Sequence, residues 1–221
     1  MKGKPAAKEV HEEAMRHLKK ADPVLYKAAL PHYRDIKPRS TAQKRYSNQK
    51  LFASLAGAVT GQQLSTKAAD SIWDRLEKAC GGEVTPEAIK RIRATTMRKA
   101  GLSNAKVKTL KELSKAVLSG GLELVALRKL PEEGAIAKLS SVWGIGRWTA
   151  EMFLLFALER EDVFSAGDLG LIRSMEMLYG IEPNSKAHVY EAVALAWAPH
   201  RSFASRILWR VRDVPSPKGM G

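Results

Sequence analysis

The stretch Leu139–Ala150, LSSVWGIGRWTA, carries the strongest local signal in the sequence. Two glycines, Gly144 and Gly146, stand on either side of Ile145 between segments of helical periodicity. Glycines let the chain reverse sharply there, and the first backbone N–H groups of the following helix stay uncovered. Those amides, the helix dipole and the charge of Arg147 suit an anion such as phosphate. A short Gly-x-Gly pattern is more often a plain corner between helices, so the residues alone leave both interpretations open.

Helical periodicity extends along the chain on both sides of this stretch. Apolar residues recur at spacings of three and four, as in Leu51, Leu55 and Val59, and no convincing run of strict alternation occurs. We therefore expect an all-α fold, with an apolar helix that runs from the reversal at Gly144–Gly146 to about Leu158. Residues that favour helix N-termini mark further helix starts, at Asp22-Pro23, Ser47, Thr85-Pro86 and Ser103.

The composition restricts the class of partner. The 221 residues include 37 Lys and Arg against 23 Asp and Glu, which gives a formal net charge of +14. An excess of this size favours nucleic acid or an anionic membrane surface as partner. The lone Cys80 excludes an internal disulfide and any four-cysteine metal or iron–sulfur site, and the five histidines are too scattered to indicate a metal site. No run of about 18 apolar residues occurs, so we expect a soluble intracellular protein.

Residues 139–150 resemble the helix-hairpin-helix motif of the HhH-GPD superfamily of DNA glycosylases. Further along, residues 162–173 (DVFSAGDLGLIR) are similar to that family's catalytic-aspartate segment, with Asp168 at the catalytic position. Residues 61–65 (GQQLS) and the pattern from Trp197 to Ser202, followed by Trp209, also match. The resemblance covers roughly residues 22–212 and is strongest to compact alkylbase (3-methyladenine) glycosylases of the bacterial inducible, AlkA-like type.

The resemblance implies one HhH-GPD unit over residues 1–221, made of two helical lobes with a central cleft that faces DNA. One lobe is expected at about residues 45–160, including the hairpin at 139–150, and the other at about 9–44 plus 161–212. Residues 1–8 and 213–221 are expected to be frayed, and residues 36–41 to form an exposed connection. A row of lysines is expected on a solvated helix face, namely Lys106, Lys108, Lys111 and Lys115.

The implied activity is that of a monofunctional DNA-3-methyladenine glycosylase II of base excision repair. Such an enzyme flips an alkylated base, chiefly 3-methyladenine or 7-methylguanine, out of duplex DNA and hydrolyses its N-glycosidic bond. The alternatives are a glycosylase for oxidised or mismatched bases and a non-catalytic DNA-binding module. The implied partner is double-stranded DNA with alkylated bases, not a membrane. We expect a monomer in the cytoplasm, beside the bacterial nucleoid, or in a nucleus.

The resemblance assigns catalysis to Asp168. A carboxylate near the sugar stabilises the positive charge that develops as the base departs, and it can orient or deprotonate the attacking water. A base that is already cationic leaves without a proton donor, which agrees with the single acid recognised here. The residues alone predict that Asp168 is the N-cap of the next helix, worth about 1 kcal/mol, and the two roles are compatible. Asp162, in a charged turn, is expected at the surface.

A cationic base is expected to lie against electron-rich rings. The resemblance aligns Trp148 and Trp209 with the family's pocket tryptophans. It places Met152 and Leu169 where an alkylbase relative carries tyrosines, which implies a wider and less aromatic pocket. Tryptophans at helical spacing are also common in cores. Three other aromatic side chains are expected in the core or in hairpin packing, namely Trp143, Phe156 and Trp197.

Flipping a base leaves a gap in the duplex that a side chain must fill. The resemblance places this wedge on the turn at residues 61–65, with Gln63 or Leu64 as the candidate. The alternative for Leu64 is an ordinary place in the core. Gln62 is expected to form hydrogen bonds within the protein or to the opposite DNA strand.

The hairpin is expected to contact the DNA backbone through Gly144, Ile145, Gly146, Arg147 and Thr149. In this superfamily it can also hold a monovalent cation through backbone carbonyls; no other cofactor and no metal bound by side chains is implied. Trp143 replaces a proline that is common before the first glycine. Trp148 replaces the Schiff-base lysine of bifunctional members, so no lyase step is expected. Arg201 and Ser202 are expected to hold the last helix by hydrogen bonds.

Overall fold

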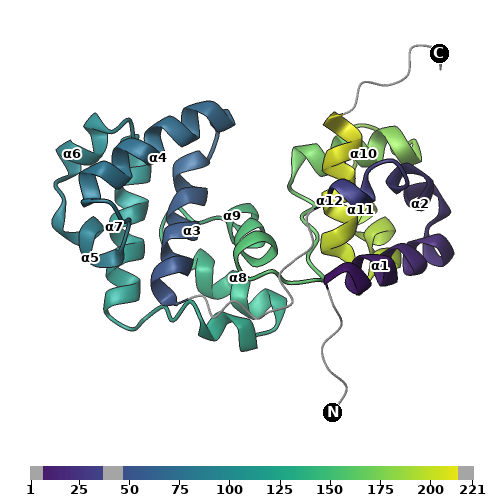
Figure 1. Ribbon diagram of the computed structural model, residues 1–221, viewed down its shortest axis with the longest axis horizontal. Helices are drawn as coiled ribbons and strands as arrows, with labels where there is room; N and C mark the ends of the chain where they lie inside the picture. The colour runs from purple at the N-terminus through teal and green to yellow at the C-terminus, as the bar shows by residue number, and fades with distance from the viewer. Residues whose placement is uncertain (1–6, 37–46, 214–221) are drawn as a thin grey trace. The chain divides into compact units, whose positions relative to one another are not determined.

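The computed structural model describes residues 7–36 and 47–213. Within these ranges every regular element is a helix and no strand occurs, which confirms the predicted all-α fold (Figure 1). No described helix is long and apolar enough to cross a membrane. The chain divides into a terminal unit, Met1–Lys44 with Glu159–Gly221, and a central unit, Arg45–Leu158.

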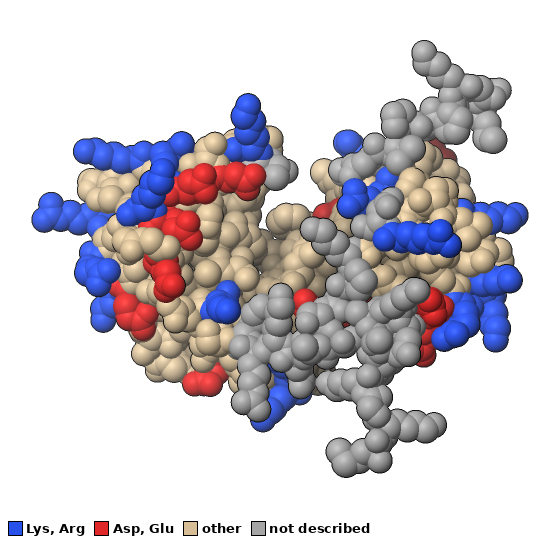
Figure 2. All heavy atoms as spheres, viewed as in Figure 1, with Lys and Arg blue, Asp and Glu red and all other residues tan. Residues whose placement is uncertain are grey.

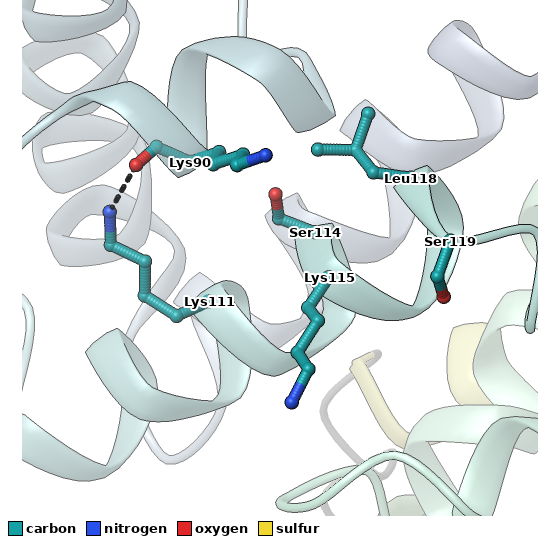
Figure 3. Close-up of a pocket in the computed structure, with 6 residues that line it drawn as sticks. All are labelled: Lys90, Lys111, Ser114, Lys115, Leu118 and Ser119. Atoms are coloured by element: carbon teal, nitrogen blue, oxygen red, sulfur yellow. Dashed lines mark hydrogen bonds between the residues drawn. The ribbon is translucent and has the colours of Figure 1, made fainter.

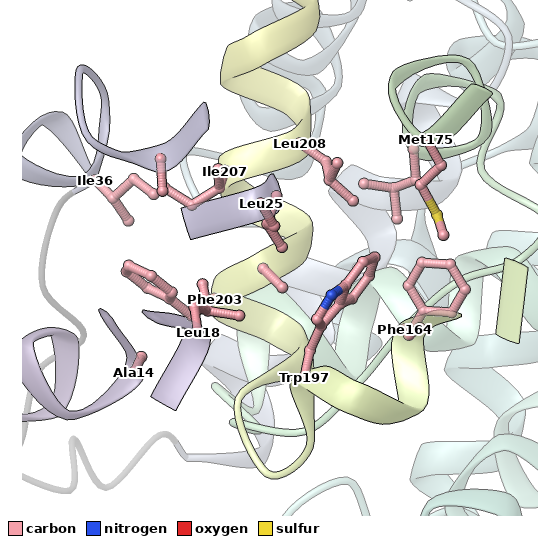
Figure 4. Close-up of a cluster of buried hydrophobic side chains, with 14 of the residues drawn as sticks. Ala14, Leu18, Leu25, Ile36, Phe164, Met175, Trp197, Phe203, Ile207 and Leu208 are labelled. Carbon is pink, nitrogen blue, oxygen red and sulfur yellow. The ribbon is translucent and has the colours of Figure 1, made fainter. Parts of the chain in front are cut away.

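The terminal unit is built around one hydrophobic core (Figure 4). Trp197 is fully buried there, and its ring meets the ring of Phe164 edge to face at 5.6 Å. Trp197 therefore has the core position that the sequence predicts. The helices of this unit are α1 (Ala7–Ala21), α2 (Pro23–Ala29), α10 (Leu169–Tyr179), α11 (Ala187–Ala194) and α12 (Arg201–Asp213), with the 3₁₀ turns η1 (Tyr33–Asp35) and η4 (Leu195–Trp197).

The central unit is organised by α3 (Asn48–Gly61), which contacts α4, α7 and α9. Leu51, Leu55 and Val59 are fully buried, as their spacing of four predicts for one helix face. The other elements of this unit are α4 (Thr66–Cys80), α5 (Pro86–Arg91), α6 (Ala94–Lys99), α7 (Asn104–Leu118), η2 (Ala126–Lys129), α8 (Glu132–Ser140), α9 (Arg147–Met152) and the π-helical turn η3 (Phe153–Ala157).

The predicted helix starts are confirmed by their caps. The Ser47 and Ser103 hydroxyls each accept a backbone N–H three residues further on at 3.3 Å, and Thr85 does so at 3.1 Å. Asp22 caps α2 through the N–H of Leu25 at 2.9 Å, with proline in the first helical turn. Each cap satisfies a donor that the helix cannot pair internally.

The first helix begins earlier than expected, inside the segment 1–8 that the sequence predicts to be frayed. Helix α1 begins at Ala7, while residues 1–6 lie outside the described part of the chain. His11 contacts the Phe203 ring at 5.0 Å and His17 bonds to the Ala196 carbonyl at 2.8 Å, so α1 is fixed by packing. Helix α12 continues to Asp213, and residues 214–221 and most of the predicted connection, 37–41, lie outside the described residues.

Charged side chains cover much of the surface that Figure 2 draws. Lysine and arginine side chains lie on both units and are not confined to one patch, and acidic side chains occur among them. On the face that Figure 2 draws, charge alone therefore does not mark a binding site, and the contacts of individual residues must identify the cations that face a ligand.

Candidate functional site

The predicted hairpin lies between α8 and α9 of the central unit. Ile145 is buried, and its N–H donates to the Val142 carbonyl at 3.1 Å, which closes the turn. Gly144 has a φ of +83°, and a Cβ there would lie 2.0 Å from Oγ1 of Thr109 on α7. Gly146 has an ordinary φ of −86°, and a Cβ there would meet no described atom within 4 Å. Packing thus requires the first glycine, whereas the second leaves one side of the turn open.

The charge expected at Arg147 is paired within the protein. Its guanidinium forms an ion pair with Glu133, and its Nε lies 2.9 Å from a carboxylate oxygen of Glu151. The hydrogen bond to Glu133 raises the pKa of the Arg147 guanidinium and lowers the pKa of the Glu133 carboxyl. Because Glu151 is 3% exposed, Arg147 stabilises a carboxylate that has little contact with water. The charge of Arg147 is therefore compensated within the protein, and contact between Arg147 and DNA stays a prediction.

The turn after α3 presents the two predicted wedge candidates to solvent. The N–H of Leu64 donates to the Gly61 carbonyl at 3.2 Å, and Gln63 has a φ of +57°. Both side chains are exposed, Leu64 at 40%, so the alternative of a core leucine is excluded. Their role as a wedge stays a prediction.

Gln62 joins this turn to the hairpin. Its side-chain amide donates to Oγ1 of Thr149 at 2.9 Å and to the Gly144 carbonyl at 3.5 Å. These bonds within the protein are one of the two roles expected for Gln62. Thr149 is buried, so its side chain supports the hairpin from inside; whether its backbone contacts DNA is untested.

The Lys106 ammonium, on α7, caps the C-terminal end of α3 at the same turn. It donates to the carbonyls of Thr60 at 2.8 Å and Gln62 at 2.7 Å, which otherwise lack helical partners. Partial burial lowers the pKa of this ammonium. The prediction that Lys106 lies on a solvated face is wrong, because carbonyls 46 and 44 residues earlier in the chain accept two of the three hydrogen bonds that its ammonium can donate.

Replacing Lys106 by methionine is expected to destabilise the central unit by about 1–3 kcal/mol, because it leaves two carbonyls without their donor while keeping most of the side-chain volume. Thermal unfolding followed by circular dichroism measures this effect. The same change at the exposed Lys115 of the same helix is the matched control, and equal losses for both variants would contradict the capping role.

Lys111 is the second lysine of the predicted solvated row on α7 that does not simply face water. Its ammonium donates to the carbonyls of Ile89, Lys90 and Ile92 at the end of α5, at 2.5, 3.0 and 2.5 Å. It borders a pocket of about 400 Å³ on the central unit, where Lys90 and Lys115 are also found (Figure 3). Because Lys111 is used in capping, only Lys108 and Lys115 of the row have the exposed position that the sequence predicts.

A pocket of about 390 Å³ lies against the hairpin of the central unit. Its lining includes Trp143 and Trp148, which are 46% and 40% exposed, together with Gln62 and Gln63 of the turn after α3. Exposed indole rings beside amide side chains can stack on a planar base. The expectation that Trp143 is packed away is therefore wrong, while the exposure of Trp148 agrees with a pocket position.

The helix after the hairpin ends differently from the regular helix that the periodicity predicts. Helix α9 stops at Met152, and the chain continues as the π-helical turn Phe153–Ala157. A π turn changes the angular spacing of side chains, and Phe156 is 57% exposed instead of packed in the core. Met152 is 8% exposed and is not among the residues that line the pocket at the hairpin, so its place in a base pocket stays untested.

In the terminal unit, Asp168 caps α10 as predicted. Its Oδ1 accepts the backbone N–H of Leu171 and the indole N–H of Trp209, both at 2.9 Å. Asp168 is 9% exposed, whereas the adjacent Leu169 is 67% exposed. The carboxylate is thus held in one orientation by two donors, and Trp209 is a neighbour of the catalytic candidate.

Asp22 has a similar arrangement of hydrogen bonds, which its sequence context does not predict. Its Oδ1 accepts the N–H of Leu25 at 2.9 Å, and its Oδ2 accepts the indole N–H of Trp197 at 2.7 Å and the Tyr179 hydroxyl at 2.6 Å. The pair Asp22-Pro23 signalled only the cap. Burial, followed by the hydrogen bond to Asp22, raises the pKa of the Tyr179 hydroxyl.

Asp162 is paired, not simply solvated as predicted. Arg201 donates to Oδ1 of Asp162 through Nε at 2.7 Å and through its backbone N–H at 3.2 Å. The Ser202 hydroxyl donates to the Arg160 carbonyl at 2.7 Å and accepts the N–H of Val163 at 3.0 Å. These bonds anchor the start of α12, as expected for Arg201 and Ser202. Asp162 therefore has a structural role as the partner of Arg201.

The predicted site residues are distributed over both units. Asp168, Leu169 and Trp209 belong to the terminal unit, whereas the wedge turn, the hairpin, Trp148 and Met152 belong to the central unit. Among the side chains that the structure describes, no group of three or more His, Cys, Asp or Glu could hold a metal ion.

A family model is similar to this chain over residues 56–199: the HhH-GPD superfamily base excision DNA repair protein. DNA-3-methyladenine glycosylase 1 of Schizosaccharomyces pombe is 32% identical over 184 residues, which are 81% of this chain and 78% of that protein.

Solved structures agree with that similarity. The structure of the DNA-3-methyladenine glycosidase of Bacillus halodurans matches this one with a TM-score of 0.74 at 32% sequence identity. The match covers 90% of this chain and 89% of that chain. The 3-methyladenine DNA glycosylase of S. pombe, in complex with abasic DNA, has a TM-score of 0.75 at 30% identity and covers 90% and 95% of the two chains.

Proposed function

This chain belongs to the HhH-GPD superfamily of base excision DNA repair proteins, and on that basis we propose that it is a DNA glycosylase that removes alkylated bases from duplex DNA. The observation that carries the proposal is the similarity, over most of the chain, to enzymes named for 3-methyladenine. The exposed indole of Trp148 and the indole of Trp209 beside Asp168 support it, because aromatic faces attract cationic bases. The proposed substrates are 3-methyladenine and 7-methylguanine.

In the proposed reaction the bond between C1′ of the sugar and the base nitrogen breaks, and its electron pair neutralises the cationic base. Positive charge then develops on the sugar, and the Asp168 carboxylate stabilises it. Water adds to C1′ and gives up a proton, which leaves a free base and an abasic sugar. The donors from Leu171 and Trp209 hold the carboxylate in place, so little reorganisation is needed as charge develops.

The turn at residues 61–65 is the proposed wedge. Flipping a base costs a few kcal/mol of stacking and pairing, and a side chain in the gap offsets part of that cost. Gln63 and Leu64 are exposed, and Lys106 and Gln62 fix the backbone beneath them. This combination of a rigid base and an exposed tip suits insertion into a duplex.

The finer features of the enzyme follow from the same proposal. With Trp148 in place of the Schiff-base lysine, we propose a monofunctional enzyme of the type II class without lyase activity. It acts as a monomer, needs no cofactor beyond a monovalent cation that the hairpin carbonyls can hold, and works in the compartment that contains DNA.

The direct test incubates the protein with N-methylated duplex DNA and, separately, with oxidised duplex DNA, and identifies the released bases by mass spectrometry. We expect 3-methyladenine and 7-methylguanine from the first substrate, abasic sites without strand cleavage, and no release from the second. Release of oxidised bases alone favours the alternative glycosylase. Binding without any release favours a non-catalytic module.

A further inference from the structure

The cation closest in sequence to the hairpin glycines, Arg147, is offset by two carboxylates. Glu133 pairs with its guanidinium, and Glu151, 3% exposed, lies 2.9 Å from its Nε. Moving Arg147 onto a phosphate would leave the buried Glu151 without this partner, which is costly. If a side chain adds positive charge to that of the backbone amides and of the monovalent cation proposed for the hairpin, it must therefore belong to another residue.

Lys108 of α7 has the required position. Its ammonium lies 4.2 Å from the centre of the Trp143 ring, directly before Gly144 in the chain. Helix α7 is fixed against the hairpin, because Thr109 occupies the space in which a Cβ of Gly144 would lie. The contact with Trp143 restricts the long lysine side chain to the hairpin side of α7.

The other lysines of this helix make different contacts. Lys106 and Lys111 donate to backbone carbonyls, and Lys115 borders the separate pocket next to Lys90. Within the described residues, no carboxylate oxygen forms an ion pair with the Lys108 ammonium, and Lys108 is exposed. Lys108 is thus an exposed cation beside the hairpin that forms no ion pair with a described carboxylate.

We propose that Lys108, held over the ring of Trp143, neutralises the DNA phosphate that the hairpin binds, and that Arg147 instead stabilises the fold. The inference rests on the proposed function, since its ligand is the DNA backbone. It also gives Trp143 a specific task as a positioning residue for Lys108.

Fluorescence anisotropy with a labelled duplex that contains one tetrahydrofuran abasic-site analogue tests the proposal between 50 and 200 mM KCl. Losing one phosphate contact is expected to make the slope of log Kobs against log[salt] shallower by about 0.9. At 50 mM KCl, Lys108→Gln should bind on the order of tenfold more weakly than the parent chain. Lys108→Arg keeps the charge and should restore the slope. Lys115→Gln, seven residues further on the same helix face, is the matched control and should keep it too.

A double-mutant cycle tests the part assigned to Trp143. Trp143→Leu should weaken binding about two- to fivefold in the parent chain, because the lysine loses its support, and should have no effect in the Lys108→Gln background. Additive effects would overturn the positioning role. Unfolding midpoints of all variants, measured in parallel, should match the parent because both side chains are exposed.

The outcomes separate this inference from the proposed function. If the parent chain binds the duplex and releases methylated bases but Lys108→Gln keeps the salt slope of Lys115→Gln, only the inference on Lys108 fails. If the parent chain neither binds DNA nor releases a base, the proposed function fails. Base release by the parent chain, together with weaker binding and a shallower salt slope for Lys108→Gln, supports both.

Discussion

Replacing Asp168 by asparagine is expected to reduce the rate of base release at least about 100-fold while folding and DNA binding persist. Asparagine is as good an N-cap as aspartate, so its side-chain oxygen can still accept the N–H groups of Leu171 and Trp209. What the substitution removes is the negative charge opposite the developing cation. Single-turnover release of 3-methyladenine from methylated duplex, with binding measured in parallel, gives the result.

Asp22 provides an unusually close control for that experiment. It too is a buried N-cap whose carboxylate accepts a helix N–H at 2.9 Å and a tryptophan indole N–H. Asp22→Asn makes the same isosteric change at a buried cap. It should cost more stability, because both oxygens of Asp22 accept hydrogen bonds, but it should not change the rate of base release at saturating DNA. If both variants lose release equally, or if Asp168→Asn retains it, Asp168 is not the catalytic carboxylate.

The features that sequence predicted well are those set by neighbouring residues. The caps at Ser47, Thr85, Ser103 and Asp168 depend on a side chain and an N–H three residues later, so the pattern alone identifies them. The steric need for Gly144 arises differently. It depends on Thr109, 35 positions earlier, and sequence could indicate only that the chain turns there.

The features that sequence missed are set by partners far away in the chain. The lysine row looks uniform by spacing, yet Lys106 reaches the Thr60 and Gln62 carbonyls, whereas Lys108 lies over Trp143. Similarly, a charged residue next to a hairpin suggests an anion site until its own partners are known. Periodicity indicates which face of a helix a residue occupies, but not which distant backbone group its side-chain terminus meets.

Replacing Gly144 by alanine is expected to cost about 2–5 kcal/mol of stability and to abolish DNA binding through the hairpin. The left-handed φ of +83° alone costs an alanine about 1–2 kcal/mol, and the added Cβ would sit 2.0 Å from Oγ1 of Thr109, which forces α7 and the hairpin apart. Thermal unfolding measures the first effect. A Thr109→Ala change in the Gly144→Ala background should recover part of the stability, because it removes the hydroxyl contact but not the backbone strain.

Gly146→Ala separates the fold of the hairpin from its contact with DNA. Its φ of −86° suits any residue and its Cβ would meet no described atom within 4 Å, so the loss of stability should stay below about 1 kcal/mol. The new methyl group would nevertheless stand at the turn where the backbone amides are proposed to meet a phosphate, so DNA binding should weaken in a protein that unfolds at almost the parent temperature. Unchanged binding by Gly146→Ala would place the phosphate elsewhere, and the large effect of Gly144→Ala would then report only the packing of the hairpin against α7.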